Sequence, residues 1–241
     1  MPTVSLRYVV TALTMGLSGA TLAIPGLADG GISLGQTRIV FISTDRAQVL
    51  GVKNSGQERF LIQSRVQMAP GNTLSAPFVV TPPLFTLQPD SRQQLRIVSM
   101  GGALPKDRES LFWLSVLAIP AQKVPDTEVS KVSMGMRFGM KLFYRPVYLG
   151  AGPQACSLQI RAQSDGVLID NPTPFFQTFG QLVLNNKPVS LDIQSSMLAP
   201  YSSQRYPTES RVIQAQWQTI DDYGVLTEMC HQTVSSAEGK T

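Results

Sequence analysis

The stretch that decides the fold runs from residue 131 to residue 148 and reads Lys131-Val-Ser-Met-Gly-Met-Arg-Phe-Gly-Met-Lys-Leu-Phe-Tyr-Arg-Pro-Val-Tyr148. Apolar side chains alternate with polar residues or glycine over its first half. This alternation predicts a β-strand with one apolar face, because successive side chains of a strand point to opposite sides. The apolar face carries Val132, Met134, Met136, Phe138 and Met140.

Two interpretations of this apolar row remain open from the pattern alone. Apolar alternation usually means that the row faces the protein's own core. Alternatively, the strand lies at an edge and offers its side chains to another chain. The three methionines in the row make the second interpretation worth testing, because methionine is favoured at surfaces that repack against more than one partner.

Composition narrows the class of protein. Short runs rich in Val, Thr, Ile and Phe recur between 19 glycines and 17 prolines, which is typical of an all-β chain. The 241 residues allow one large domain or two of about 100 residues each. Only 15% of the residues are charged, the formal net charge is +4, and no basic run occurs, so nucleic-acid binding is not expected.

The first 28 residues resemble a secretory signal peptide. Arg7 precedes an apolar stretch over residues 8–22, and small residues at 26–28 suit cleavage before Asp29. The alternative is an uncleaved anchor, but the stretch falls short of the roughly 20 residues that span a bilayer. We therefore expect an exported protein that does not span a membrane after cleavage. Cys156 and Cys230, which lie outside any Cys-x-x-Cys spacing, fit one disulfide in such a protein.

The order of runs and turns predicts two successive sets of short strands at β-sandwich spacing. The strand expected at residues 78–85 contains Pro82 and Pro83, which cannot donate to a β-ladder and so mark an edge, a kink or a change of sheet. Both prolines are candidates for a cis bond. The other strands of the first half are expected at residues 32–41, 48–53, 59–66, 94–98 and 110–119, besides the opening stretch. Those of the second half are expected at 156–161, 167–171, 177–184, 187–193, 204–207, 212–220 and 225–230.

Six blocks, in order over almost the whole mature chain, resemble the periplasmic chaperones of the chaperone–usher pathway, the PapD-like family that assembles pili. The resemblance implies an all-β protein of two immunoglobulin-like β-sandwich domains in an L or boomerang arrangement. Its domains would be residues 29–149 and 150–241, after a signal peptide at 1–28. The blocks are Thr37-Arg-Ile-Val40, Val79-Val-Thr-Pro-Pro-Leu-Phe85, Asp107-Arg-Glu-Ser-Leu-Phe-Trp113, Lys141-Leu-Phe-Tyr-Arg-Pro146, Asn171-Pro-Thr-Pro174 and Asp222-Tyr-Gly224.

The resemblance also implies a function. A chaperone of this family binds, folds and caps pilus or fimbrial subunits in the periplasm and delivers them to an outer-membrane usher. Arg38 and Lys141 match the residues that anchor the subunit's C-terminal carboxylate, a role that suits a guanidinium and an ammonium group. The apolar row at residues 132–140 would enter the groove of a subunit that lacks its own last strand. Burying five such side chains would contribute on the order of 10 kcal/mol before the costs of association.

Further roles follow from the same resemblance. Glu109, Arg145 and Asp222 match positions that form a charged network between the domains and fix the angle between them. The short linker at residues 120–130 resembles the branch with a compact loop before the last strand, which serves rod-like pili. Cys156 departs from the family pattern, and we predict that it pairs with Cys230 inside the second domain. A self-capping dimer is left open, because an exposed apolar edge favours association.

Other classes of function are weaker. Gly31-Ile-Ser-Leu-Gly35 matches the Gly-x-Ser-x-Gly elbow of hydrolases, but that motif requires a strand before it and a helix after it. The single histidine, His231, leaves no second general base and argues against a metal site, and no phosphate-binding loop is present. We expect neither catalysis nor a cofactor. The main alternative is an immunoglobulin-like surface adhesin or fibre subunit, for which the segment from Asp29 to Ile32 is too short as a donor extension.

Overall fold

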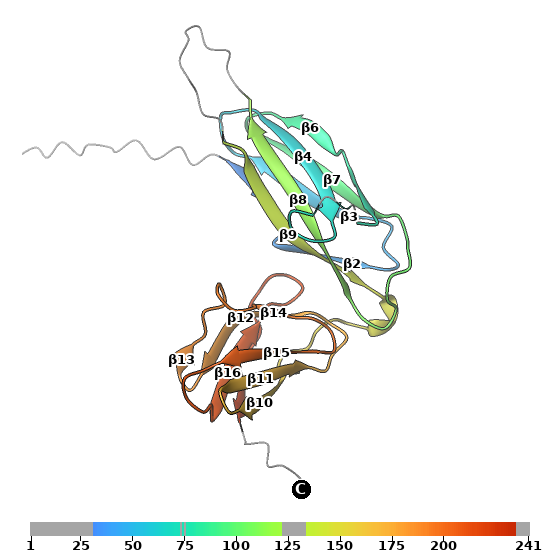
Figure 1. Ribbon diagram of the computed structural model, residues 1–241. Helices are drawn as coiled ribbons and strands as arrows, with labels where there is room; N and C mark the ends of the chain where they lie inside the picture. Colours follow the sequence, from blue (N-terminus) through green and yellow to red (C-terminus); the bar gives the residue numbers. More distant parts are fainter. Residues whose placement is uncertain (1–30, 73, 75, 122–133, 235–241) are drawn as a thin grey trace, which may run out of the picture.

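The computed structural model describes residues 31–72, 74, 76–121 and 134–234, which fold as two β-sandwiches (Figure 1). The expected all-β class is confirmed. Within the described residues the only helical element is the single 3-10 turn η1 (Val147–Leu149), which lies between the sandwiches. No helix in this part of the chain is long and apolar enough to cross a membrane. The expected signal peptide lies outside the described residues.

The first sandwich consists of two sheets. One sheet has the order β1-β3-β7-β5, with β1 (Ile32–Leu34), β3 (Gln48–Asn54), β7 (Ser91–Ser99) and β5 (Phe78–Thr81). The other has the order β2-β9-β8-β4-β6, with β2 (Arg38–Ile42), β9 (Met136–Arg145), β8 (Ser110–Pro120), β4 (Phe60–Gln67) and β6 (Leu84–Leu87). Neighbouring strands are antiparallel, except that β2 pairs with β9 in parallel.

Two segments of the first sandwich cross from one sheet to the other. The expectation of one strand over residues 32–41 was wrong, because the chain breaks after Leu34 and β1 pairs with β3 while β2 pairs with β9. Residues 78–85 break at the two prolines, where β5 pairs with β7 and β6 with β4. This change of sheet confirms the expectation, since proline cannot continue the ladder. The Thr81–Pro82 bond is cis.

The space between these sheets is filled by large apolar side chains. Phe78 lies at the centre, with ring-centre distances of 5.4 Å to Phe41 and 5.1 Å to Phe112. Each fully buried side chain of this size contributes roughly 1.5–3 kcal/mol. The core therefore holds β2 and β9 firmly in place through Phe41 and Leu142, which are both buried.

The second sandwich has its own sheets and core. One sheet has the order β10-β11-β15, and the other has the order β13-β12-β16-β17, with β14 paired to β12. Trp217 and Tyr206 are its largest fully buried side chains. A disulfide joins Cys156 to Cys230 with their Cα atoms 5.3 Å apart, as predicted. The strands are β10 (Gln159–Gln163), β11 (Gly166–Asn171), β12 (Gln177–Leu184), β13 (Lys187–Pro188), β14 (Met197–Leu198), β15 (Ser202–Pro207), β16 (Gln214–Thr219) and β17 (Cys230–Thr233).

Two expectations for the second sandwich were wrong. β13 covers only residues 187–188 of the strand expected at 187–193, and β17 begins at Cys230, where a strand was expected to end. Most of residues 221–229 instead form a loop. The side chain of Asp221 accepts the N–H groups of Tyr223 and Val225 at 2.9 and 2.8 Å, and such bonding favours a turn over a strand.

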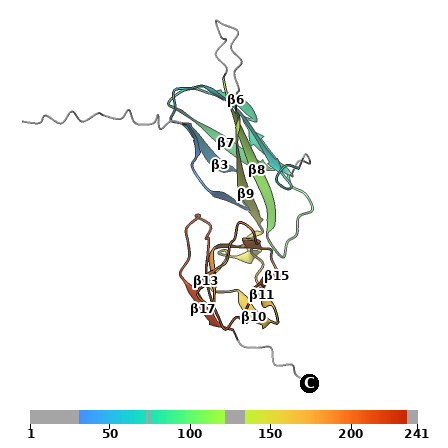
Figure 2. The same cartoon turned by 60° about the vertical axis from the view of Figure 1, so that its left-hand side comes forward.

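The two sandwiches meet end to end. In both views the second sandwich lies below the first, with its loops against the lower ends of β8 and β9 (Figure 1 and Figure 2). The loop at residues 221–229 takes part in this contact, because Gly224 lies against Thr37 of the first sandwich. Residues of both sandwiches therefore surround the junction.

Candidate functional site

Arg38 and Lys141 form a cationic pair near this junction. They are direct partners in the parallel pairing of β2 with β9. Arg38 is the first residue of β2, so the pair marks the point at which β9 acquires its second neighbour. Both side chains are half-buried, which places two positive charges in an environment that solvates them poorly.

Arg38 is only partly satisfied by its surroundings. Its Nη1 donates a hydrogen bond to the carbonyl oxygen of Ile220 at 3.0 Å, and its guanidinium carbon lies 5.8 Å from the ring centre of Phe143. Among the described residues its Nε has no hydrogen-bond partner although it is buried. Burial lowers the pKa of Arg38, an effect that Asp222, Asp221 and Glu109 oppose. An unpaired buried donor is unfavourable, so an incoming acceptor would stabilise this group.

Lys141 has no hydrogen bond or ion pair with any residue that the structure describes. Its pKa is lowered, first by burial and then by the positive charge of Arg38. Both causes would be offset by an anion bound to the two side chains, because opposite charge favours the protonated amine. The pair therefore has the chemistry of a carboxylate-binding site.

A hollow of about 420 Å³ opens beside Arg38. Residues of both sandwiches line it, including Val40 and Ile42 of β2 on one side and Asp222 and Tyr223 on the other. Lys141 does not line this hollow, although Arg145, four residues later on β9, does. Arg38 is therefore the member of the cationic pair that a ligand in this hollow would contact.

On the N-terminal side of Lys141, one edge of β9 is open. β2 pairs with residues 141–145 of β9, whereas β8 pairs with residues 136–144. Within the described part of the chain, residues 136–140 therefore have a neighbouring strand on one side only. Such an edge presents unpaired N–H and C=O groups that can accept another strand.

The apolar row changes from buried to exposed along this open edge. Met140 is buried with 3% of its surface exposed, and Phe138 is half-buried against the core. Met136 is 42% exposed and Met134 79% exposed. The row is thus shared between the two interpretations left open by the sequence, with Met140 in the protein's own core and the methionines before it facing solvent. Val132 and most of the linker at residues 120–130 lie outside the described residues.

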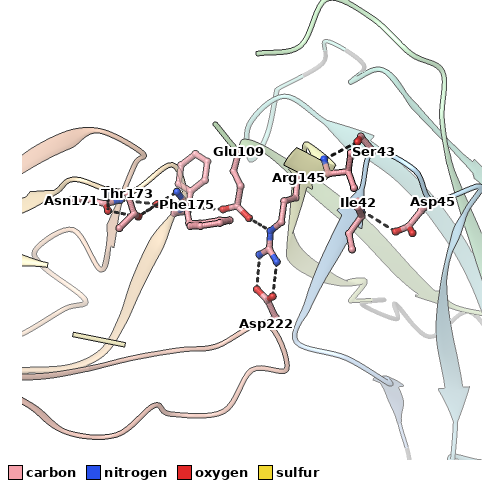
Figure 3. A network of polar contacts seen from close by, with 11 residues as sticks. Ile42, Ser43, Asp45, Glu109, Arg145, Asn171, Thr173, Phe175 and Asp222 are labelled. Atoms are coloured by element: carbon pink, nitrogen blue, oxygen red, sulfur yellow. Dashed lines mark hydrogen bonds and ion pairs between the residues drawn. The ribbon is translucent and has the colours of Figure 1, made fainter. Parts of the chain in front are cut away.

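A second group of charges connects the sandwiches (Figure 3). Arg145, the last residue of β9, donates from Nε to Oε1 of Glu109 at 2.7 Å. Its Nη1 and Nη2 donate to the two carboxylate oxygens of Asp222, also at 2.7 Å. Glu109 immediately precedes β8 of the first sandwich, and Asp222 belongs to the loop of the second sandwich. The predicted network is thus assembled in space as well as matched in sequence.

This charge network is buried and extended by backbone groups. Glu109 and Arg145 are each 4% exposed, and Oε2 of Glu109 accepts the N–H of Phe176 at 2.8 Å. Burial raises the pKa of Glu109, an effect opposed by Arg145 and by the N–H of Phe176. Burial works against the charge of Arg145, but its hydrogen bonds to Asp222 and its attraction to Glu109 prevail and raise its pKa.

A glycine makes room for the charge network. A Cβ atom on Gly152 would lie 2.7 Å from Nη1 of Arg145 and 2.8 Å from Oδ2 of Asp222. Gly152 also has a φ of +104°, which side chains rarely adopt. The short segment between the sandwiches therefore needs glycine at this position.

Sequence reasoning missed the backbone partners of these charged side chains. Ile220 supplies a carbonyl oxygen to Arg38, Phe176 supplies an N–H to Glu109, and Pro174 accepts the N–H of Glu109 at 2.9 Å. Backbone groups have no residue-type signature. The available signal was the Asn171-Pro-Thr-Pro174 turn, which directs the chain after it toward the first sandwich.

The fold and this junction place the chain among two-domain immunoglobulin-like β-sandwich proteins. Within that class the chain belongs to the PapD family of pilus-assembly chaperones. Residues 31–150 match the pili and flagellar-assembly chaperone, PapD N-terminal domain, and residues 153–231 match the pili assembly chaperone PapD, C-terminal domain. The resemblance inferred from the six sequence blocks is therefore confirmed.

Individual relatives agree with this assignment. The chain is 34% identical over 235 residues to the probable fimbrial chaperone LpfB of Escherichia coli O157:H7, which covers 95% of this chain and 97% of the relative. It is 31% identical to the chaperone protein FimC of Escherichia coli K12, with 86% of each chain covered.

Solved structures are similar over most of the chain. The complex of Salmonella enterica SafA pilin with the SafB chaperone matches with a TM-score of 0.77 and 28% identity, covering 85% of this chain and 96% of that one. The Escherichia coli chaperone DraB matches with a TM-score of 0.74 and 33% identity, covering 85% and 97%.

Proposed function

We propose that this protein is a periplasmic chaperone that binds, folds and caps pilus or fimbrial subunits by strand donation and delivers them to an outer-membrane usher. The observation that carries the proposal is the cationic pair of Arg38 and Lys141 at the end of the open edge of β9. Support comes from the relatives, which are named fimbrial chaperones, and from the similarity to a chaperone bound to a pilin.

The subunit's C-terminal carboxylate is the proposed ligand of the cationic pair. Arg38 has a buried Nε that lacks a partner among the described residues, and Lys141 has an ammonium group whose charge burial disfavours. A carboxylate offers several acceptor sites and one negative charge. Hydrogen bonds to charged groups contribute roughly 1.5–3 kcal/mol each, so loss of either cation would weaken capture strongly.

A strand ending in that carboxylate would lie along the open edge of β9. Main-chain hydrogen bonds to residues 136–140 would hold it with little dependence on its sequence. The row of Val132, Met134, Met136, Phe138 and Met140 would complete the subunit's apolar groove. In the free protein Met140 already packs in the core, so Phe138 and the two exposed methionines would supply most of the new contact among the described members of the row.

The remaining parts of the proposal concern location and assembly. Residues 1–28 would direct export and be removed, and the disulfide between Cys156 and Cys230 suits an oxidising compartment such as the periplasm. The domains would be residues 29–149 and 150–241. Glu109, Arg145 and Asp222 would fix the angle between them. The subunit and the usher would then both bind a single arrangement of the two domains. The open edge also favours pairing of two copies of the chain, so a self-capping dimer would compete with subunit binding.

Periplasmic co-expression with a pilus subunit of the same organism tests the function. Wild type is compared with Arg38→Ala, Lys141→Ala and, as the matched control, Arg92→Ala, which removes an exposed cation from β7. We expect wild type and Arg92→Ala to keep the subunit soluble and bound, and the other two variants to lose it while remaining folded. Equal recovery of soluble subunit with all four proteins would contradict the proposal that Arg38 and Lys141 bind the subunit's carboxylate. Failure of wild type to retain any subunit would favour the adhesin or fibre-subunit alternative.

A further inference from the structure

Two methionines of β9 and the segment before it are accessible in the free protein. Met134 is 79% exposed and Met136 is 42% exposed, whereas Met140 is 3% exposed and packs into the core. Met136 is the first residue of β9 and lies on the open edge, opposite Ala118 of β8. The thioethers of Met134 and Met136 can therefore meet small solutes in solution, while that of Met140 is shielded.

We propose that Met134 and Met136 form an oxidation site at which a hypohalous acid switches off subunit capture. The inference rests on the function proposed above, in which both side chains enter a subunit groove. Thioethers become sulfoxides under such oxidants, and the change converts an apolar side chain into a polar one. The exposed row would thus act as a sensor of oxidant only while no subunit covers it.

The oxidation is a balanced two-electron step. The sulfur lone pair attacks the chlorine of hypochlorous acid, so that an S–Cl bond forms, the O–Cl bond breaks and hydroxide leaves. Water then adds to sulfur, chloride leaves, and two protons are released, one of which neutralises the hydroxide. The net products are the sulfoxide, chloride and one proton. Sulfur loses two electrons and chlorine gains them.

Sulfoxidation would oppose capture because of where these side chains must go. A sulfoxide oxygen is a hydrogen-bond acceptor, and burial of such a group without a donor is unfavourable. In the subunit groove it would replace an apolar contact that the thioether makes without cost. Strand donation would therefore weaken although the fold of the chaperone stays intact, since neither methionine contributes to its buried core.

The chain offers an internal control. Met68 and Met100 are also exposed, at 46% and 68%, but lie beyond the ends of β4 and β7 and not on β9. They should be oxidised by the same treatment without altering capture. Leucine is close to methionine in volume and cannot form a sulfoxide, so it serves as the replacement at all four positions.

The experiment treats wild type, Met134→Leu/Met136→Leu and Met68→Leu/Met100→Leu with increasing hypochlorous acid. Peptide mass spectrometry then locates the sulfoxides, and capture of a pilus subunit diluted from denaturant is measured. We expect oxidation of Met134 and Met136 before Met140, and capture by wild type and Met68→Leu/Met100→Leu to fall by at least about tenfold. Treated Met134→Leu/Met136→Leu should capture as much subunit as the same variant does untreated, and methionine sulfoxide reductase should restore capture to oxidised wild type.

Two results would overturn the inference alone. One is undiminished capture by wild type that mass spectrometry shows to be oxidised at both positions. The other is equal loss in Met134→Leu/Met136→Leu, which would assign the effect to other methionines. Should the leucine variant fail to fold, the dose dependence and the reductase rescue of wild type still decide the question. Absence of capture by untreated wild type would instead defeat the proposed function, and this inference with it.

Discussion

Arg38 and Lys141 lie opposite each other across the parallel pairing of β2 with β9, and no described carboxylate forms an ion pair with either. Burial opposes the charge of both side chains, and Arg38 further opposes that of Lys141, whereas Asp222, Asp221 and Glu109 favour the charge of Arg38. Keeping Lys141 charged therefore lowers the stability of the free protein, a cost that binding of the proposed subunit carboxylate would offset.

Replacement of Lys141 should separate stability from function. We expect Lys141→Met to raise the free energy of unfolding by on the order of 1 kcal/mol, because it removes a poorly solvated charge and keeps the apolar stem. The same change should abolish subunit capture. Urea denaturation followed by fluorescence measures the first effect. The control is Lys53→Met, at an exposed position of β3, which should leave stability unchanged. A loss of stability in Lys141→Met would contradict this account.

The stabilising effect of Lys141→Met should depend on pH. The pKa of Lys141 is lowered from 10.5 by burial and by Arg38. Below the folded-state pKa the lysine is charged in both states and the burial cost is fully present. As pH rises toward 10.5 the folded protein releases this proton first, so the cost declines. The difference in free energy of unfolding between Lys141→Met and wild type should therefore be larger at about pH 7 than at about pH 10. A constant difference would argue against the lowered pKa.

The buried network at the junction should respond according to exposure. Glu109→Gln should lower the free energy of unfolding by about 3–5 kcal/mol. The variant removes the negative charge beside Arg145, and its amide N–H₂ would face either Nε of Arg145 or the N–H of Phe176, which are both donors. Asp222→Asn should cost less, about 1.5–3 kcal/mol, because the Asp222 side chain is 29% exposed. Thermal denaturation ranks the variants, and small-angle scattering reports the angle between the domains. Asp107→Asn, in the exposed pair with Arg108, is the control, and an equal effect there would contradict the ranking.

Loss of the disulfide should affect the second sandwich selectively. A bridge that closes a separation of 74 residues stabilises by about 4 kcal/mol in the chain-entropy model. Cys156→Ser/Cys230→Ser should therefore destabilise the second sandwich while the first keeps its midpoint, as seen by hydrogen exchange resolved along the sequence. Thiol titration of the denatured, unreduced wild type should find no reactive thiol. Two reactive thiols would rule the bridge out.

Gly224 should resist substitution because of its neighbour across the junction. Its φ is +86°, and a Cβ there would clash with Oγ1 of Thr37. Gly224→Ala should displace the loop that carries Asp222 and so weaken both the network and subunit capture. Thr37→Ala should restore part of the loss by removing the contact, although the strained φ remains. Gly51→Ala, with no atom within 4 Å of the added Cβ, is the control.

Much of the architecture could be predicted because strands leave a strong local pattern. Alternation identified β9, the order of apolar runs and turns identified most other strands of the first sandwich, and Pro82 and Pro83 marked the change of sheet between β5 and β6. The break between β1 and β2 was missed because residues 35–37, which separate the two strands, include no proline to mark the change of sheet, unlike the segment between β5 and β6. The segment at residues 225–230 was misassigned because Val225 and Leu226 suggest a strand, whereas the side chain of Asp221 stabilises a turn at its start.

The site was less accessible to sequence reasoning because its members meet only in three dimensions. Family motifs selected Arg38, Lys141, Glu109, Arg145 and Asp222, and the structure supplies the register and the hydrogen bonds between them. Pattern alone could not divide the apolar row into the buried Met140 and the exposed Met134. Met140 belongs to the core cluster of the first sandwich, whereas Met134 lies before β9 begins, and both are tertiary properties.

The start of β2 fixes how many residues of β9 remain unpaired on one edge before the cationic pair. Residues 136–140 leave about 13–17 Å of open strand before the cationic pair, at about 3.3 Å per residue. A partner strand held by its terminal carboxylate would have its register set by counting residues back from its own last atom. One added or deleted residue at that end would turn every side chain to the opposite face. A strand of suitable composition whose apolar residues stand at the wrong spacing from its last residue would thus present its polar face, so the edge would distinguish partners by that spacing.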